Sequence, residues 1–229
     1  DDVYLIKTDS LGNQQWNSSF DPYDYGNSIL TSSIFQTSDL GYVFLTHKNS
    51  WTTDSLNLIK ADSNGNEQWN KKLVYDTVAS YGHYINQNMQ KSYDGGYIIS
   101  SRVHLNYNPG GEIFTWLIKI DSNGNKLWDR KLFLNYSLDI ISIQETSDYG
   151  YIMTGYTTQS SQQPSNLLLI KTDSIGVIQW QQQLSSTSIK TKGSDVKETF
   201  DGGYIVLGTE WGLSTGSSFL LVKYQDNYS

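Results

Sequence analysis

Short apolar segments separated by polar turns recur along the whole chain. They are rich in β-branched and aromatic residues, which favours strands, and "GYVFLT" (41–46) is typical of them. No segment keeps a 3.6-residue apolar period, so we expect helices to be absent or minor. Runs such as "LLLI" (167–170) and "YIVL" (204–207) are apolar on both faces, as strands are when both sides of their sheet are covered. The pattern predicts an all-β chain.

Two motifs repeat along the chain with a period near 50 residues. The first is "LIKADSNGNEQW" (58–69), and its four copies end at Trp16, Trp69, Trp128 and Trp180. The second has the form D-x-G-Y, as in "YDGGY", and its copies place Tyr42, Tyr97, Tyr151 and Tyr204. Self-similarity at such a period is typical of solenoids, propellers and other arrays.

The first motif resembles a calcium loop, because Asp62, Asn64 and Asn66 alternate around a glycine. Calcium needs an oxygen ligand at each of these places, but Leu11 and Ile175 stand where Asn64 stands here. The four copies share only the pattern D-S-x-G, in which x varies. This pattern is typical of a tight hairpin turn with a bulge. The turn glycines are Gly12, Gly65, Gly124 and Gly176. We therefore expect hairpin turns and no metal site.

Each repeat predicts four short antiparallel strands, which is the make-up of a β-propeller blade. A β-sandwich is the alternative, but sandwiches lack such a repeat. The chain would hold about four blade-equivalents: three complete blades and a partial blade at each end. It begins and ends on a third strand, Val3–Thr8 and Phe219–Tyr224. The repeats run approximately over 1–28, 29–82, 83–137, 138–191 and 192–229, within one propeller domain or a segment of a larger propeller.

The sequence "D-S-x-G-N-x-x-W" after an apolar strand resembles the tryptophan-docking motif of quinoprotein-type propellers. Together with "DGGYI", it resembles the propeller repeats of large secreted or surface proteins of bacteria and archaea. The resemblance covers essentially the whole chain. It implies a fold and an extracellular or cell-surface location, and it implies no reaction.

The repeated tryptophans have two possible roles. They could pack each blade onto its neighbour, or they could form a row of sugar-stacking platforms. Repetition at one fixed slot favours packing, and we expect the rings to be mostly buried. The motif lysine lies two residues before the motif aspartate, on the same strand face, so we expect Lys60 to pair with Asp62 as an exposed ion pair of small effect.

The two ends of the chain lead to a separate expectation. If the amino-terminal strands completed the last sheet, two third strands would compete for one position. We therefore expect the open strand edges to be covered by self-association or by additional blades of the same polypeptide.

The composition of the chain limits the classes of partner that it could bind. The chain has 229 residues and a formal net charge of −7, which disfavours nucleic acid. No apolar run reaches the roughly 20 residues that a membrane helix needs. There is no cysteine, so disulfides and thiol chemistry are excluded. Three sequons, at Asn17, Asn135 and Asn227, make the chain a candidate glycoprotein and agree with an extracellular location.

Loops from second to third strand, and between blades, vary in length and lie together at one face of the expected fold. Function concentrates on variable loops carried by a rigid scaffold. This face is rich in aromatic residues suited to ligand contact, although any of them could instead cap a blade end. The candidate binding residues are Tyr23, Tyr25, Trp51, Tyr81, His83, Tyr107 and Trp211.

The sequence contains few motifs that are typical of enzymes. The three histidines have no metal-ligand spacing, and neither a nucleophile elbow nor a phosphate-binding loop occurs. We therefore expect no cofactor and no catalysis. The leading hypothesis is a non-enzymatic extracellular adhesion or binding module that takes a glycan or a protein. The alternatives are a structural or spacer subunit of a cell-surface assembly or filament and, third, a glycan-active hydrolase or lyase.

Overall fold

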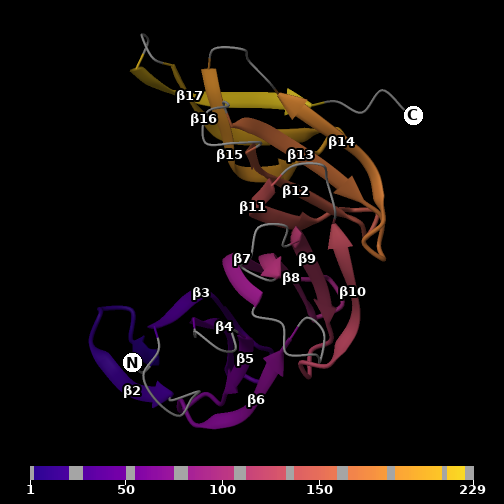
Figure 1. The fold of residues 1–229 in the computed structure, drawn as a ribbon. Helices are drawn as coiled ribbons and strands as arrows, with labels where there is room; N and C mark the ends of the chain where they lie inside the picture. Colours follow the sequence, from indigo (N-terminus) through magenta and orange to yellow (C-terminus); the bar gives the residue numbers. More distant parts are fainter. Residues whose placement is uncertain are drawn as a thin grey trace. The chain divides into compact units, whose positions relative to one another are not determined.

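The computed structural model of the chain describes residues 3–20, 28–49, 55–74, 82–105, 112–132, 137–158, 165–184, 189–212 and 216–224. The described residues form antiparallel strands joined by tight turns, and they contain no helix that could span a bilayer (Figure 1). They group into two compact units, residues 1–84 with 104–112 and residues 85–103 with 113–229.

The described strands form five separate sheets. The two-stranded sheet contains β1 (Val3–Thr8) and β2 (Gln14–Phe20). The first four-stranded sheet contains β3 (Ser28–Gln36), β4 (Tyr42–Asn49), β5 (Ser55–Ala61) and β6 (Glu67–Leu73). The second contains β7 (Gly82–Lys91), β8 (Tyr97–Leu105), β9 (Glu112–Ile120) and β10 (Lys126–Leu132). The third contains β11 (Ser137–Glu145), β12 (Tyr151–Thr158), β13 (Asn166–Thr172) and β14 (Ile178–Leu184). The last, three-stranded, contains β15 (Ile189–Glu198), β16 (Tyr204–Gly212) and β17 (Gly216–Tyr224).

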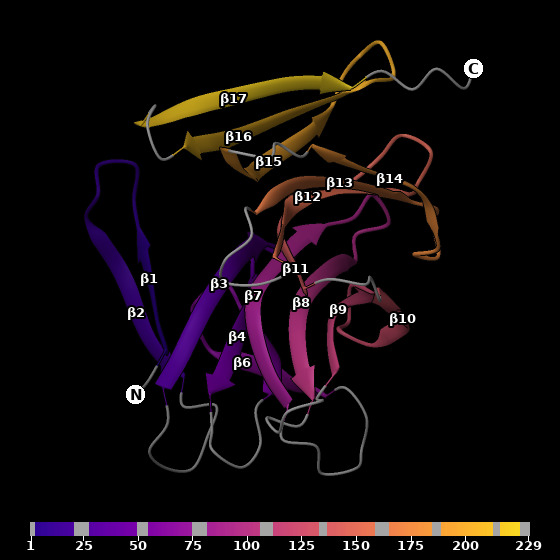
Figure 2. The ribbon, with the colours of Figure 1, turned by 45° about the horizontal axis from the view of Figure 1, so that its top comes forward.

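Every sheet follows chain order, so each is a simple antiparallel meander of the kind that forms a propeller blade. Figure 2 shows β15, β16 and β17 side by side in this order. The predicted fold class is confirmed: along the chain, a two-stranded half blade is followed by three complete blades and then by a three-stranded one. The third strands β1 and β17 also stand where the sequence predicted them.

The D-S-x-G segments form hairpin turns between third and fourth strands. Gly65 has φ +86°, and the strand register shifts between Lys60 and Ala61, which marks a bulge. The Asp62 carboxylate accepts hydrogen bonds from the backbone N–H groups of Asn64 and Asn66, at 2.8 and 2.9 Å. It also accepts one from the Asn66 side-chain amide at 2.9 Å. Donors therefore surround the carboxylate that a calcium loop would keep for the ion.

Apolar side chains of neighbouring blades pack face to face. In the second unit, Leu117 of β9 belongs to one buried cluster with Tyr151 and Met153 of β12 and Ile170 of β13. Leu169 on the opposite face of β13 belongs to the next cluster, with Val206 of β16. Each complete third strand is therefore buried on both sides, which explains why its sequence does not alternate between apolar and polar residues.

Within each unit, repeat tryptophans pack against the neighbouring blade. Trp16 donates from Nε1 to the Ser63 carbonyl oxygen at 3.1 Å, and its ring centroid is 5.8 Å from that of Tyr42. A Cβ at Gly65 would stand 2.8 Å from Trp16 Cζ3, so the turn glycine lets the ring approach the backbone. Trp128 has the same relation to Gly176 and to Tyr151, whose ring centroid is 6.0 Å away. One motif thus supplies the docking ring, and its next copy supplies the surface that receives the ring.

The four rings are partly buried and none of them is exposed, which agrees with the prediction of mostly buried rings. Each stands on the fourth strand, which is the last strand of its sheet. Cationic side chains lie near two of the rings: Lys71 Nζ is 5.5 Å from the Trp69 centroid, and Arg130 Cζ is 5.9 Å from that of Trp128.

The D-x-G-Y turns between first and second strands contain a local conflict. The residue between Asp and Gly has a positive φ in each turn, and Gly95 and Gly202 adopt it without strain. Leu40 and Tyr149 adopt it at φ 63°, which is unfavourable for residues with a Cβ. The exposed rings of Tyr93 and Tyr149 are in edge contact, with centroids 6.3 Å apart.

This conflict predicts opposite backbone effects at two tyrosines. Tyr149→Gly and Tyr93→Gly both remove the edge contact and both add a flexible glycine, but only Tyr149→Gly relieves a positive φ. We expect the Tyr149→Gly protein to be about 1–2 kcal/mol more stable than the Tyr93→Gly protein. Urea unfolding of both variants measures this difference, and equal stabilities would contradict it.

Candidate functional site

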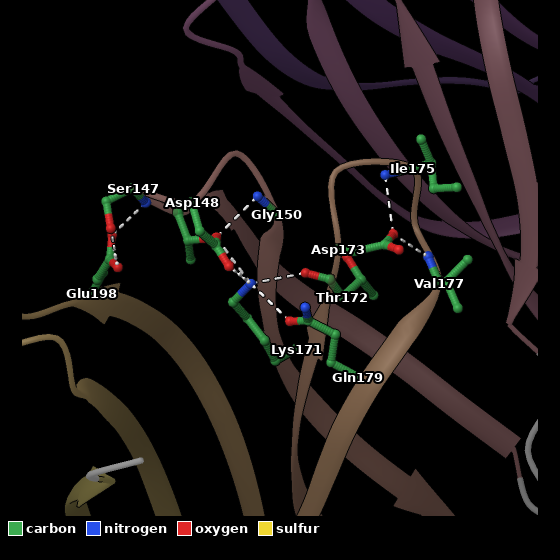
Figure 3. A network of polar contacts seen from close by, with 11 residues as sticks. Ser147, Asp148, Gly150, Lys171, Thr172, Asp173, Ile175, Val177, Gln179 and Glu198 are labelled. Carbon is green, nitrogen blue, oxygen red and sulfur yellow. Dashed lines mark hydrogen bonds and ion pairs between the residues drawn. The ribbon is translucent and has the colours of Figure 1, made fainter. Parts of the chain in front are cut away.

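A buried lysine anchors the turn end of each complete blade. Lys171 Nζ on β13 donates to both carboxylate oxygens of Asp148, at 3.0 and 2.8 Å, and to the Thr172 carbonyl oxygen at 2.9 Å (Figure 3). Gln179 Oε1 also lies within hydrogen-bond distance of this ammonium group, at 3.2 Å. Lys60 pairs with Asp39, and Lys119 pairs with Asp94. The expected pairing of Lys60 with Asp62 was wrong, because Asp62 caps its own turn and the lysine bonds the D-x-G-Y aspartate.

The expected exposure of these lysines was also wrong, since Lys60 and Lys171 are only 5% and 3% exposed. The glycine of D-x-G-Y makes room for them. A Cβ at Gly41 would overlap Lys60 Nζ and the Ala61 carbonyl oxygen, and a Cβ at Gly150 would overlap Lys171 Nζ. The lysine of the first motif and the aspartate and glycine of the second are therefore parts of one structural device.

The turn ends of neighbouring blades are also joined by glutamates. Glu198 of β15 accepts hydrogen bonds from the backbone N–H and the hydroxyl of Ser147, both at 2.8 Å (Figure 3). Glu145 of β11 accepts the backbone N–H of Tyr93 at 2.6 Å. These contacts occupy the turn end with structural bonds, so a ligand site is better sought at the opposite end of the strands.

Most candidate binding residues lie outside the described part of the chain. These are Tyr23, Tyr25, Trp51, Tyr81 and Tyr107, together with the sequon residues Asn135 and Asn227. His83 falls on β7, and its side chain is outside the described set. Asn17 is exposed on β2. Trp211 is half-buried near the end of β16 and is the candidate that the structure describes in detail.

Trp211 belongs to a polar and aromatic group at the loop end of the second unit, which we call the loop-end cluster: Arg102, Asp139, Tyr156, Lys192 and Trp211. Lys192 Nζ lies 4.0 Å from the Tyr156 ring centroid and 5.2 Å from that of Trp211. Arg102 Nη1 donates to the two carboxylate oxygens of Asp139, at 3.1 and 2.8 Å. The cluster therefore joins second strands and first strands of three blades.

Burial and charge set the protonation of the cluster. Asp139 is 2% exposed, and the Arg102 guanidinium neutralises it. Burial raises the pKa of the Tyr156 phenol, and the Asp139 carboxylate, which is hydrogen-bonded to it, raises this pKa further. Tyr156 is therefore a neutral phenol at ordinary pH. The carboxylate is held by a cation and a phenol, so the cluster is arranged to hold its geometry and to present ring faces and a lysine cation.

The sequence alone did not single out Arg102, Asp139, Tyr156 or Lys192. The repeat nevertheless indicated two of these positions. Arg102 and Tyr156 each lie five residues after a repeat tyrosine, and the other two copies carry His47 and Thr209 at this position, which we call the slot. The chemical type changes from copy to copy at this slot. The flanking scaffold stays constant, as the tyrosine and the buried third strand do in each complete blade. A slot that varies within a constant repeat is the mark of a position free to take up function.

Two acidic side chains of the described loop end, Asp139 and Glu210, both accept hydrogen bonds from neighbouring side chains. No group of three or more His, Asp or Glu side chains that could hold a metal ion occurs among them. Glu210, near Trp211, accepts a hydrogen bond from the Ser218 hydroxyl at 2.9 Å. The described loop end is thus organised around aromatic rings and a lysine.

The comparisons with known proteins concern the fold. No family model matches the sequence, and no curated protein matches it. Among solved structures, an endo-arabinase from Bacteroides thetaiotaomicron VPI-5482 is similar at 11% identity, with a TM-score of 0.46, over 85% of this chain and 74% of that chain. A candidate exo-beta-1,3-galactanase from Bifidobacterium bifidum s17 is similar at 11% identity, with a TM-score of 0.49, over 97% and 78%. The WD40 domain of SCAP from fission yeast has 8% identity and a TM-score of 0.31, over 94% and 70%. All three identities are low, and all three TM-scores lie below 0.5.

The buried lysines predict an asymmetric response to mutation. Asp148→Asn would leave the Lys171 ammonium buried without its anion, and we expect it to cost about 2–3 kcal/mol of unfolding free energy. Lys171→Met would leave only a half-exposed aspartate and should cost about 1 kcal/mol or less. The equivalent pair of Lys223 and Asp201 is exposed on both sides, so Asp201→Asn is the matched control, at under about 1 kcal/mol. Urea unfolding checks the order, and equal costs for Asp148→Asn and Asp201→Asn would contradict it.

The aspartates of these turns also predict acid sensitivity. The Thr37 hydroxyl and then the Lys60 ammonium lower the pKa of Asp39 from 3.8 to about 2. Because the pKa is lower in the folded state, the stabilisation is complete above the unfolded value and is lost as the pH falls from about 4 to 2. Unfolding free energies measured from pH 6 to 2 should fall in this window. They should fall less steeply in Asp39→Asn, and parallel curves would contradict the assignment.

Proposed function

We propose that the chain is a non-enzymatic, extracellular propeller module that binds a glycan at the loop-end cluster of its second unit. The observation that supports this proposal is the position of Lys192 against the rings of Tyr156 and Trp211, beside the Arg102–Asp139 pair. Sugar sites combine a ring face for the apolar side of a pyranose with a few fixed hydrogen-bonding groups. The cluster offers both within a small area.

Two features favour binding over catalysis. Asp139 is buried, ion-paired with Arg102 and hydrogen-bonded to Tyr156, so its carboxylate is engaged in structural contacts. Glycoside hydrolysis requires two carboxyl groups on opposite sides of that bond. Another acidic side chain, Glu210 beside Trp211 on β16, is hydrogen-bonded to Ser218. A protein ligand would need a contact area of about 800 Å² on this chain, far more than five side chains supply.

A structural role in a surface assembly is the second candidate. Tyr4 and Ile6 on β1 are mostly exposed, and so are Phe219 and Leu221 on β17. Their counterparts in the complete blades are buried between neighbouring sheets. Such faces suit the stacking of further blades or subunits, and this role is compatible with glycan binding at the loop end.

The binding proposal predicts that substitutions at the loop end, but not at the turn end, weaken glycan binding. The probe is an array of neutral and acidic glycans, followed by calorimetry with any glycan retained. We expect Trp211→Ala and Lys192→Ala to weaken binding at least about 10-fold, because each removes a group that would contact the sugar. The matched control is Phe200→Ser, since Phe200 is a fully exposed aromatic residue on a D-x-G-Y turn at the other end.

Three outcomes would contradict the proposal. The array could retain no glycan, Phe200→Ser could weaken binding as much as Trp211→Ala, or the wild-type chain could release reducing sugar from a retained glycan. The last result would favour the hydrolase or lyase hypothesis over a binding module.

A further inference from the structure

Lys192 carries the one charge of the loop-end cluster that is not compensated within it. Arg102 and Asp139 neutralise each other, with Nη1 2.8 Å from the nearer carboxylate oxygen. Tyr156 is a neutral phenol, and the Trp211 ring has no charge. Lys192 lies against these two rings, and no carboxylate of the described residues forms an ion pair with it. The cluster as a whole is therefore positive, and its charge is on the Lys192 ammonium.

The strand register explains why Lys192 lies beside Trp211. Lys192 stands opposite Thr209 of β16, and Lys190 stands opposite Trp211. Lys192 and Trp211 are therefore diagonal neighbours on one face of the sheet, a separation that long and aromatic side chains can span. Lys190 is exposed, and because it is two residues from Lys192 it adds a second cation to the same face.

The acidic residues near this face do not neutralise Lys192. Glu210 directly precedes Trp211, so its side chain lies on the other face of β16, where it accepts a hydrogen bond from the Ser218 hydroxyl. No aspartate or glutamate occurs in the four segments that follow β10, β12, β14 and β16 along the chain, which are 133–136, 159–164, 185–188 and 213–215. These segments therefore offer no anion to the lysine.

The two rings fix the position of the Lys192 ammonium and leave its N–H donors available. A ring face attracts a cation through its quadrupole. No oxygen of the described residues accepts a hydrogen bond from Lys192, whereas the Lys171 ammonium donates to Asp148 and to the Thr172 carbonyl oxygen. Lys192 is thus a positioned cation with donors that a ligand can use.

We propose that the glycan bound at the loop-end cluster is acidic, with its carboxylate or sulfate group on Lys192 and the apolar side of its sugar ring against Trp211. This inference rests on the glycan-binding function proposed above and names the class of glycan. An anionic oxygen group meets both the charge and the donors of the ammonium, through charge-assisted hydrogen bonds that are stronger than neutral ones. A neutral sugar would supply acceptors alone and would leave the charge uncompensated.

The charge of the whole chain makes this recognition local. The formal net charge is −7, so most of the surface repels an acidic glycan. Attraction has to come from a place where cations gather without nearby anions, as Lys190 and Lys192 do. A preference for acidic over neutral glycans should therefore depend on Lys192.

The test uses the full chain and matched pairs of glycans. The acidic probes are oligosaccharides that contain hexuronic acid, terminal sialic acid or a sugar sulfate. Each is paired with its neutral counterpart, prepared by carboxyl reduction, or by desulfation for the sulfated probe. We expect calorimetry to show that the wild-type chain binds an acidic probe at least about 10-fold more tightly than its counterpart. The carboxylate and sulfate arms show which acidic group the site takes.

Four variants assign the preference to Lys192. Lys192→Gln should abolish the preference, because it removes the charge and keeps a polar side chain, and Lys192→Arg should retain most of it. Trp211→Ala should weaken both members of a pair by a similar factor, since the ring contacts the sugar. Lys197→Gln is the matched control: it removes a positive charge from the same strand, where Lys197 lies beside Asp195, and it should leave the preference unchanged.

The outcomes distinguish this inference from the glycan-binding proposal. If the wild-type chain binds acidic and neutral counterparts equally and Trp211→Ala weakens both, the acidic ligand is overturned and glycan binding stands. If no probe of either kind binds, both are overturned. An acidic preference that survives in Lys192→Gln would also overturn the inference. The matched pairs are compared on the wild-type chain, so the result holds even if a Lys192 variant fails to fold.

Discussion

The structure depends on one constraint, which is that a blade must be covered on both faces. Its third strand is apolar on each side, and Leu117, Leu169 and Ile170 are buried only because the next or the preceding sheet lies against them. A single four-stranded sheet of this composition would leave both of its faces in water. The tryptophan motif follows from the same constraint, because Trp16 and Trp128 fix the outer edge of one sheet to a turn of the next. Blades of this type are therefore units of a stack, stable through their neighbours.

Within each blade, a buried ion pair explains why two distant motifs recur together. A lysine ammonium that is only 3–5% exposed is costly unless its charge is neutralised and its protons are bonded. Asp148, the Thr172 carbonyl oxygen and Gln179 meet that need for Lys171. The glycine that precedes the repeat tyrosine leaves the space that the lysine occupies. A substitution of the lysine, the aspartate or the glycine would leave the other two without their contacts. All three residue types therefore occur in each complete blade.

The sequence predicted the architecture well because strand, turn and period signals are local. The strands, the three complete blades and the third strands at both ends follow from the positions of Gly, Asp and apolar residues alone. It failed for the lysine partner, since proximity along the strand suggested Asp62, whereas the cross-strand register brings Asp39 to Lys60. The burial of the tryptophans was predicted, because repetition at one fixed slot indicates packing, and all four are partly buried on the last strand of their sheets. The loop-end cluster was missed because its members come from three blades, and only the fold brings Arg102 to Asp139.

The two ends of the strands differ in how freely their residues can change. At the turn end, the Asp and Gly of D-x-G-Y and the lysine are held by mutual contacts, so copies remain alike and even Tyr149 is retained at an unfavourable φ. At the loop end, the slot five residues after the repeat tyrosine carries His47, Arg102, Tyr156 and Thr209 in successive copies. The lysine and the tryptophan at the turn end keep the sheets in place whatever that slot contains. A repeat fixed at one end can therefore vary side chains at the other with little loss of stability, and a cluster such as Lys192 between two rings can arise there from residues that no single blade requires.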